Sequence, residues 1–117
     1  MKILVVDDED IVLESCQAVL EEEGFEALLV SSADRAIETM KNEDITLLLI
    51  DLKMPKHDGM YLIEEVKKKW PLTPVIVMSG YYTTQTIKDV VEKGATSFIA
   101  KPFEPDELVN IDRKSVV

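Results

Sequence analysis

The residues best suited to chemistry in this sequence come directly after short apolar runs. Four runs are followed in this way: 3–6 by Asp7 and Asp8, 46–50 by Asp51, 75–78 by Ser79, and 97–100 by Lys101. Three carboxylates, a hydroxyl and an ammonium would then meet if the runs end at one place. Carboxylates packed that closely repel each other, and a hard divalent cation with oxygen ligands relieves the repulsion. This donor set favours Mg²⁺, with Mn²⁺ as the alternative ion.

A divalent cation, a carboxylate, a lysine and a hydroxyl together are typical of phosphoryl transfer. The cation neutralises charge on the transferring group, Lys101 contacts its oxygens, and Ser79 can hydrogen-bond to one of them. A carboxylate can itself be the nucleophile and form an aspartyl phosphate. Asp51 is the favoured nucleophile because it stands alone after its run, whereas Asp7 and Asp8 form a pair suited to holding a metal ion.

Five apolar runs, at 3–6, 27–30, 46–50, 75–78 and 97–100, are the strands expected to position these residues. The first, third and fourth are continuously apolar, which is typical of strands buried on both faces of a parallel sheet. The stretches between the runs have helical period. Their apolar stripes are Val12, Cys16, Val19 and Leu20; Ala33, Ala36, Ile37 and Met40; Leu62, Ile63 and Val66; and Ile87, Val90 and Val91. A fifth helix is expected to begin near Pro105.

Strand and helix thus alternate five times with short connections, which predicts right-handed βαβ units and a parallel sheet covered by helices on both faces. The predicted fold class is α/β, a single-domain (βα)5 doubly wound parallel sheet over residues 1–117, with the flavodoxin-like strand order 2-1-3-4-5. In such sheets ligands bind outside the carboxyl ends of the strands. The reactive residues stand at those ends.

The composition narrows the classes of partner. The 117 residues carry 13 Lys and Arg against 23 Asp and Glu, a formal charge of −10, which argues against nucleic acid or an anionic membrane as a direct partner. No apolar run approaches the length of a transmembrane helix. The first residues turn acidic too soon for a signal peptide, and the single cysteine, Cys16, cannot form an internal disulfide. We therefore expect a cytoplasmic domain.

Taken together, these motifs resemble the receiver domain of two-component response regulators. The matching elements are Asp7-Asp8, Asp51-Leu-Lys-Met-Pro-Lys-His-Asp58-Gly59, Ser79-Gly80 and Phe98-Ile-Ala-Lys101-Pro102. They occur in the family's order over essentially the whole chain. The resemblance implies a phosphoacceptor signalling domain that catalyses only its own phosphorylation and dephosphorylation and is otherwise not an enzyme.

The resemblance also implies a role for each matching residue. Asp51 is expected to be the phosphoacceptor. The direct metal ligands would be Asp8, Asp51 and the backbone carbonyl of Lys53, with Asp7 acting mainly through water. Lys101 is expected to be the phosphate-binding lysine. Ser79 is expected to be the switch hydroxyl, and Phe98 the switch aromatic residue.

The implied phosphodonor is a sensor histidine kinase or a phosphotransfer protein. The implied output is a change of the surface formed by helix 4, strand 5 and helix 5, which would act on an effector domain, a partner or a second copy. A stand-alone regulator, a phosphorelay intermediate and the front of a transcription factor all remain open as the wider context.

Other functions of this fold class fit the residues less well. The acidic loop that starts at Asp7 would repel a flavin phosphate, and a haloacid-dehalogenase-type phosphatase needs a second Asp at position 53, which is Lys. No glycine-rich nucleotide-binding motif occurs. The serious rival is a receiver-like module that acts only as a constitutive interaction domain.

Overall fold

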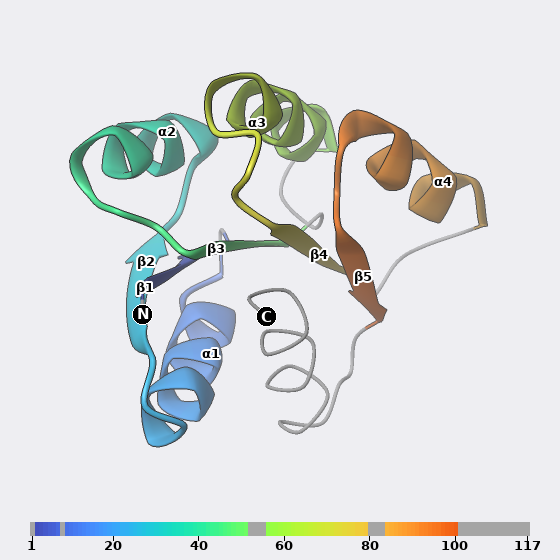
Figure 1. Cartoon of the computed structure of the whole chain (residues 1–117). Helices are drawn as coiled ribbons and strands as arrows, with labels where there is room; N and C mark the ends of the chain where they lie inside the picture. The colour runs from blue at the N-terminus through green and yellow to red at the C-terminus, as the bar shows by residue number, and fades with distance from the viewer. Residues whose placement is uncertain (1, 8, 52–55, 80–83, 101–117) are drawn as a thin grey trace.

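A five-stranded parallel sheet forms the centre of the computed structural model, which describes residues 2–7, 9–51, 56–79 and 84–100 (Figure 1). The strands are β1 (Lys2–Val6), β2 (Glu26–Val30), β3 (Leu47–Asp51), β4 (Val75–Ser79) and β5 (Ser97–Ala100). They lie in the order β2-β1-β3-β4-β5, and every neighbouring pair is parallel. This order confirms the predicted doubly wound α/β sheet.

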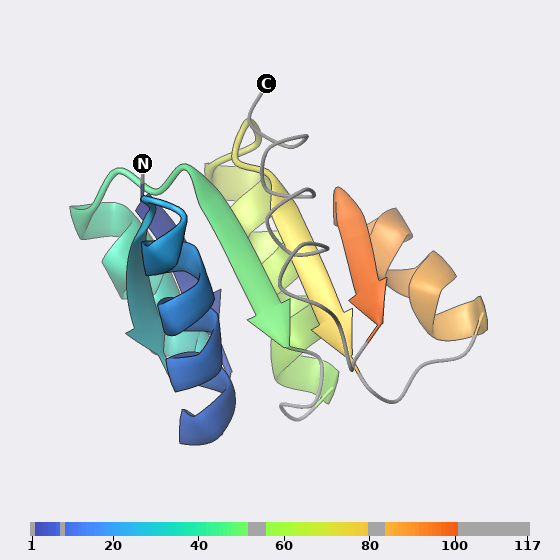
Figure 2. The ribbon, with the colours of Figure 1, turned by 90° about the horizontal axis from the view of Figure 1, so that it is seen from below.

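The helices cover both faces of the sheet, as the continuous apolar strands require. They are α1 (Asp10–Glu22), α2 (Ala33–Asn42), α3 (Lys56–Lys69) and α4 (Thr84–Lys93). Figure 1 shows α2, α3 and α4 on one face and α1 on the other, and Figure 2 shows the strands running side by side between them. The helix expected from Pro105 lies outside the described residues.

Two apolar layers hold the helices to the sheet. Alternate residues of the strands supply the two layers, because successive side chains of a strand point to opposite faces. Leu4, Leu48 and Val77 pack in the layer under α2, α3 and α4. Ile3 and Leu49 pack with α1 in the other layer. Most residues of the predicted helical stripes supply the opposite walls, and Cys16 is buried in the second layer, as expected from its place on a stripe. Val91, which was also expected on a stripe, is instead 54% exposed on α4.

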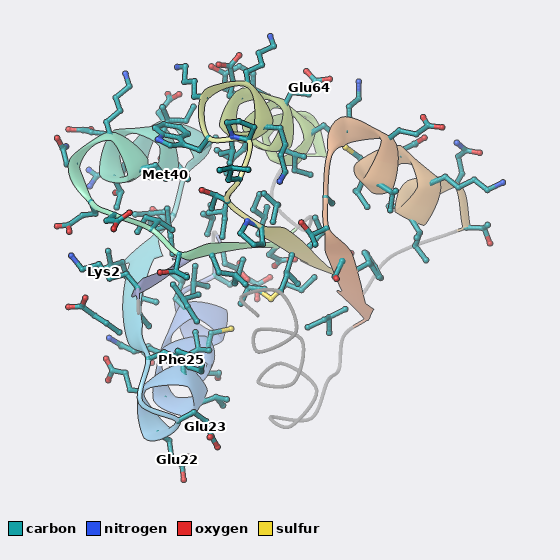
Figure 3. All side chains as sticks on the ribbon, viewed as in Figure 1. Lys2, Glu22, Glu23, Phe25, Met40 and Glu64 are labelled. Atoms are coloured by element: carbon teal, nitrogen blue, oxygen red, sulfur yellow. The ribbon has the colours of Figure 1, made fainter. Side chains whose placement is uncertain are left out.

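Polar and charged residues set the helix ends and the outer surface. Ser32 caps α2, since its Oγ accepts a hydrogen bond from Arg35 N at 3.3 Å. Gly94 follows α4 with a φ of +117°, and a Cβ there would lie 2.5 Å from Lys67 Cγ, so only glycine fits without strain. In Figure 3, Glu22 and Glu23 project from the end of α1. None of the helices in the described residues has both the length and the apolar character needed to cross a membrane.

Candidate functional site

The first feature of the site is the pairing of Asp7 with Asp51 at the carboxyl ends of β1 and β3. The ladder between these strands runs to the pair Val6 and Ile50, so the next residues along are Asp7 and Asp51. Both carboxylates are fully buried. Asp7 continues the extended path of β1, because its N–H donates to Val30 O on β2 at 3.2 Å. The register of two central strands therefore places two buried carboxylates next to each other.

Strand alternation places both carboxylates on the α1 side of the sheet. Asp7 continues the alternation of Ile3 and Val5, and Asp51 that of Leu49, all of which pack in the layer against α1. The segment that leads into α1 is hydrogen-bonded to Asp7. Asp7 Oδ1 accepts a hydrogen bond from Glu9 N at 2.9 Å, just before α1 begins. The carboxylate of Asp7 thus also shapes the turn that leads into the helix.

Ser79 and Phe98 lie together on the opposite face. In the ladder between β4 and β5, Val77 pairs with Phe98 and Ser79 pairs with Ala100. Ser79 is two residues beyond Val77, so it and Phe98 belong to the same face and are diagonal neighbours. Ser79 is 1% exposed, and Phe98 is half-buried against the layer under α2, α3 and α4. Ser79 and Phe98 are therefore neighbours on the face of the sheet that α2, α3 and α4 cover.

The other predicted site residues, Asp8, Lys53 and Lys101, lie outside the described residues. Within residues 2–7, 9–51, 56–79 and 84–100, no group of three or more His, Cys, Asp or Glu side chains is placed to hold a metal ion. The described part supplies two carboxylates, Asp7 and Asp51. Their buried oxygens have the hard character that Mg²⁺ requires, and one or two carboxylates are its usual complement of protein ligands. The donors therefore fit the predicted ion.

Sequence reasoning missed the ion pair that ties α4 to α3. Lys93 Nζ lies 2.6 Å from Glu64 Oε1, and the two side chains are each about half exposed. The hydrogen bond from Lys93 lowers the pKa of Glu64, and the same bond raises the pKa of Lys93. Nothing in the sequence marked this pair, because both residues are ordinary charged positions on different helices.

Comparison with known proteins identifies the family. A model described as the response regulator receiver domain matches residues 3–112, nearly the whole chain. The chain belongs to the response regulator receiver domain family. The receiver domain is the part of two-component response regulators that accepts a phosphoryl group, so the family and signalling role predicted from the sequence are confirmed.

Two relatives of this receiver domain are named as a transcriptional regulator and as a response regulator. It is 37% identical over 115 residues to the hydrogenase transcriptional regulatory protein HoxA of Cupriavidus necator, covering 97% of this chain and 24% of that protein. It is 33% identical over 109 residues to the putative response regulator NtrX-like of Rickettsia bellii, covering 92% of this chain and 23% of that protein. The chain thus spans about a quarter of the length of these relatives.

Solved structures share the fold over almost the full length of the receiver domain. A CheY-like receiver domain protein of Methanospirillum hungatei is 30% identical with a TM-score of 0.92, covering 98% of this chain and 92% of that one. The beryllofluoride-activated NtrC4 receiver domain dimer is 30% identical with a TM-score of 0.91, covering 98% and 95%.

Proposed function

We propose that this receiver domain is a phosphorylation-dependent switch in which Asp51 accepts the phosphoryl group. The phosphodonor is a phosphohistidine on a sensor histidine kinase or a phosphotransfer protein. The observation that carries the proposal is the placement of Asp51, fully buried at the end of β3, directly beside the buried Asp7 at the end of β1. The match to the receiver domain family over residues 3–112 also supports this proposal.

The transfer is a displacement at phosphorus. One carboxylate oxygen of Asp51 forms a bond to phosphorus as the phosphorus–nitrogen bond of the phosphohistidine breaks. The released imidazole keeps the electron pair and takes up a proton. Lys101 contacts the phosphoryl oxygens, and hydrolysis later adds water at phosphorus and returns the Asp51 carboxylate and inorganic phosphate. No external metabolite is turned over.

Four groups are assigned to the cation, which is Mg²⁺ with Mn²⁺ as the alternative. They are the carboxylates of Asp8 and Asp51, the backbone carbonyl of Lys53, and Asp7 acting through water. When bound, the ion neutralises charge on the phosphoryl oxygens. Asp7 and Asp51 lie as close neighbours with buried oxygens, and this supports the assignment. Asp7 also keeps the turn into α1 in place through Glu9 N, so the site and the helix are positioned together.

The proposed switch depends on Ser79 and Phe98. A phosphoryl group on Asp51 offers the Ser79 hydroxyl a charged acceptor, and movement of Ser79 toward it frees space beside Phe98. The diagonal placement of Ser79 and Phe98 on one face of the sheet supports this coupling. A ligand shifts such an equilibrium only through its different affinity for the two states.

We assign the output to a surface that includes α4 and β5. Val91 on α4 is 54% exposed, an apolar group available to a partner. We assign to this surface an effector domain, another protein or a second copy of the chain, and we assign residues 1–117 to one cytoplasmic receiver domain.

Incubation with a small-molecule phosphodonor tests the proposed function. With Mg²⁺ present, intact mass should rise by one phosphoryl group, and base should remove it because an acyl phosphate is labile. With the cation chelated, the modified fraction should fall by at least about ten-fold, since nothing then offsets the carboxylate charge. Equal modification with and without Mg²⁺ would contradict the assigned role of the cation, and no modification at all would favour a constitutive interaction module.

Replacing Ser79 by Ala should separate phosphorylation from switching. We expect the variant to accept beryllofluoride at Asp51 while losing most of the amide chemical-shift change that the wild type shows around Val90 and Phe98. The reason is that the phosphoryl mimic no longer has a hydroxyl to bind. Ser97→Ala, which deletes a hydroxyl at the start of β5, is the matched control and should keep the full change. A full wild-type pattern in Ser79→Ala would show that Ser79 is no switch.

A further inference from the structure

The outer edge of β2 is an open strand edge. β2 pairs with β1 alone, and no other strand of the part of the chain described in the structure pairs with its far side. In Figures 1 and 2 it lies at the end of the sheet opposite β5. Natural proteins usually protect such an edge with lysine, proline or a bulge. The strand Glu26–Val30 has no lysine or proline and four apolar residues in a row.

The backbone of this edge is ready to pair. Val30 O accepts a hydrogen bond from Asp7 N, so the N–H and C=O groups of Val30 face β1. These groups alternate in direction along a strand. The groups of Leu28 therefore also face β1, and those of Ala27 and Leu29 face outward.

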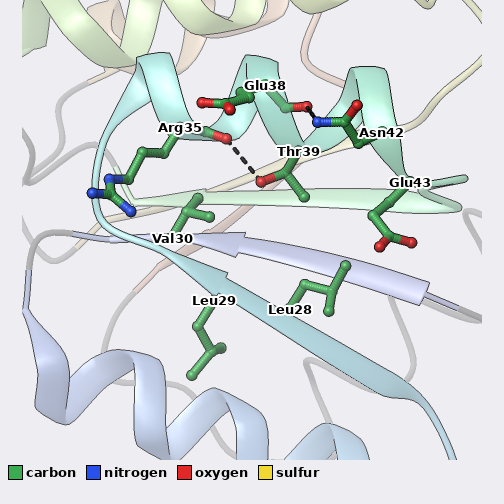
Figure 4. A pocket seen from close by; sticks show the side chains of 8 residues that line it. All are labelled: Leu28, Leu29, Val30, Arg35, Glu38, Thr39, Asn42 and Glu43. Carbon is green, nitrogen blue, oxygen red and sulfur yellow. Dashed lines mark hydrogen bonds between the residues drawn. The ribbon is translucent and has the colours of Figure 1, made fainter.

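The side chains along the edge are apolar and half-buried. Figure 4 shows Leu28 and Val30 directed toward α2 and Leu29 directed toward α1. Leu28 and Val30 form the floor of a groove of about 430 Å³ between β2 and α2. Two polar side chains of the groove wall are bound within α2, because Thr39 Oγ1 donates to Arg35 O at 2.8 Å and Asn42 Nδ2 donates to Glu38 O at 3.1 Å, and the carboxylate of Glu38 also lines the wall. The groove therefore offers an apolar floor with charged ends.

The charges at the two ends of the groove are opposite. In Figure 4, Arg35 lies at the Val30 end of β2, and Glu43 lies at the other end, beyond Leu28. Lys2 Nζ donates to Glu43 Oε2 at 2.6 Å, and two further carboxylates, those of Glu26 and Asp44, also act on Lys2, so negative charge exceeds positive charge at this end. A surface with opposite charges at its ends matches a copy of itself turned by a two-fold rotation, because each end then meets its opposite.

We propose that β2 is a homodimer surface at which two copies of this chain pair their β2 strands antiparallel, with the two-fold axis at Leu28. That register overlaps the strands fully. Ala27 of one copy and Leu29 of the other exchange their outward N–H and C=O groups, and the two Leu28 side chains lie opposite each other. Arg35 of each copy approaches Glu43 of the other. The two sheets join into one continuous sheet.

This surface is separate from the proposed switch. It lies at the β2 end of the sheet, whereas α4 and β5 lie at the other end. Pairing at β2 therefore requires neither Mg²⁺ nor phosphorylation, and it leaves the α4 face free. The charge of −10 on each chain opposes the approach of two copies, so salt that screens this repulsion should favour the dimer.

Sedimentation of the unphosphorylated chain from micromolar to millimolar concentration tests the proposal. The wild type should show a concentration-dependent dimer. Leu28→Lys should weaken it by at least about ten-fold, because two ammonium groups then stand directly opposite each other. Leu72→Lys makes the same change at a side chain that is 94% exposed in the loop before β4 and should leave the dimer unchanged. Val91→Lys on α4 should leave it unchanged as well.

Cross-linking provides a measurement that does not depend on introducing charge. Under mild oxidation, Leu28→Cys should form disulfide dimers about ten-fold faster than Leu72→Cys, although position 72 is far more exposed, because paired cysteines are held close together. The wild type, with buried Cys16 alone, is the background. A wild type that stays monomeric at millimolar concentration, a dimer lost in Val91→Lys but kept in Leu28→Lys, or a Leu28→Cys rate no higher than that of Leu72→Cys would each overturn the proposal.

Discussion

Asp51→Asn is expected to lower modification by a small-molecule phosphodonor by at least about 100-fold when Mg²⁺ is present. The amide has nearly the same shape as the carboxylate, so the fully buried position at the end of β3 should still pack. It lacks the anionic oxygen that attacks phosphorus. Intact mass after a fixed incubation measures the modified fraction, and a thermal unfolding scan checks that the variant is folded.

Two further variants make this result specific to Asp51. Asp44→Asn is the matched control, because Asp44 is an exposed aspartate in the connection before β3 and should be modified like the wild type. Asp7→Asn changes the neighbouring buried carboxylate. If Asp51→Asn is modified as fully as the wild type, the acceptor is misassigned, and loss of modification in Asp7→Asn alone would move the acceptor to Asp7.

Leu48→Ala is expected to destabilise the domain by about 3 kcal/mol, within the range of about 2–5 kcal/mol for deleting a buried leucine side chain. Leu48 is fully buried in the third strand, where it pairs with Leu4 on one side and Val75 on the other. Truncation would leave a cavity under α2 and α3 that the flanking strands cannot close. The unfolding midpoint should fall by roughly 10 °C or more, measured by circular dichroism.

Leu72→Ala makes the same chemical change at a leucine that is 94% exposed. We expect it to change the free energy of unfolding by less than about 0.5 kcal/mol, since little apolar contact is lost. The pair of variants separates burial from residue type. Similar destabilisation by both would mean that Leu48 is not packed in the sheet as described.

Much of the fold could be read from local patterns. The continuous apolar run before Asp51 predicted a strand buried on both faces, and β3 is buried along its whole length. Ser32 directly precedes the apolar stripe that begins at Ala33, and its Oγ caps α2 by accepting from Arg35 N. These features are visible in sequence because burial periodicity and capping involve residues close together in the chain. The strand order also followed, since alternating strands and helices allow few arrangements of a parallel sheet.

The candidate site was predicted as a set of residue types, and the structure supplied their neighbours. The sequence placed Asp7 and Asp51 after strands, but only the register of β1 and β3 sets them side by side. The register of β4 and β5 likewise places Ser79 and Phe98 on one face. Register depends on contacts between residues distant in the chain, which no local periodicity encodes.

The sequence by itself determined which residues are buried in strands, where the four described helices lie, and which strand ends carry carboxylates and a hydroxyl. Only the tertiary structure decided which of those groups meet, that Glu64 and Lys93 join α3 to α4, and that β2 has no strand partner on its outer side among the described residues. The physical reason is the range of the interactions. Apolar patterning reports burial residue by residue, whereas pairing, ion pairs between helices and surface grooves arise from the way whole elements pack.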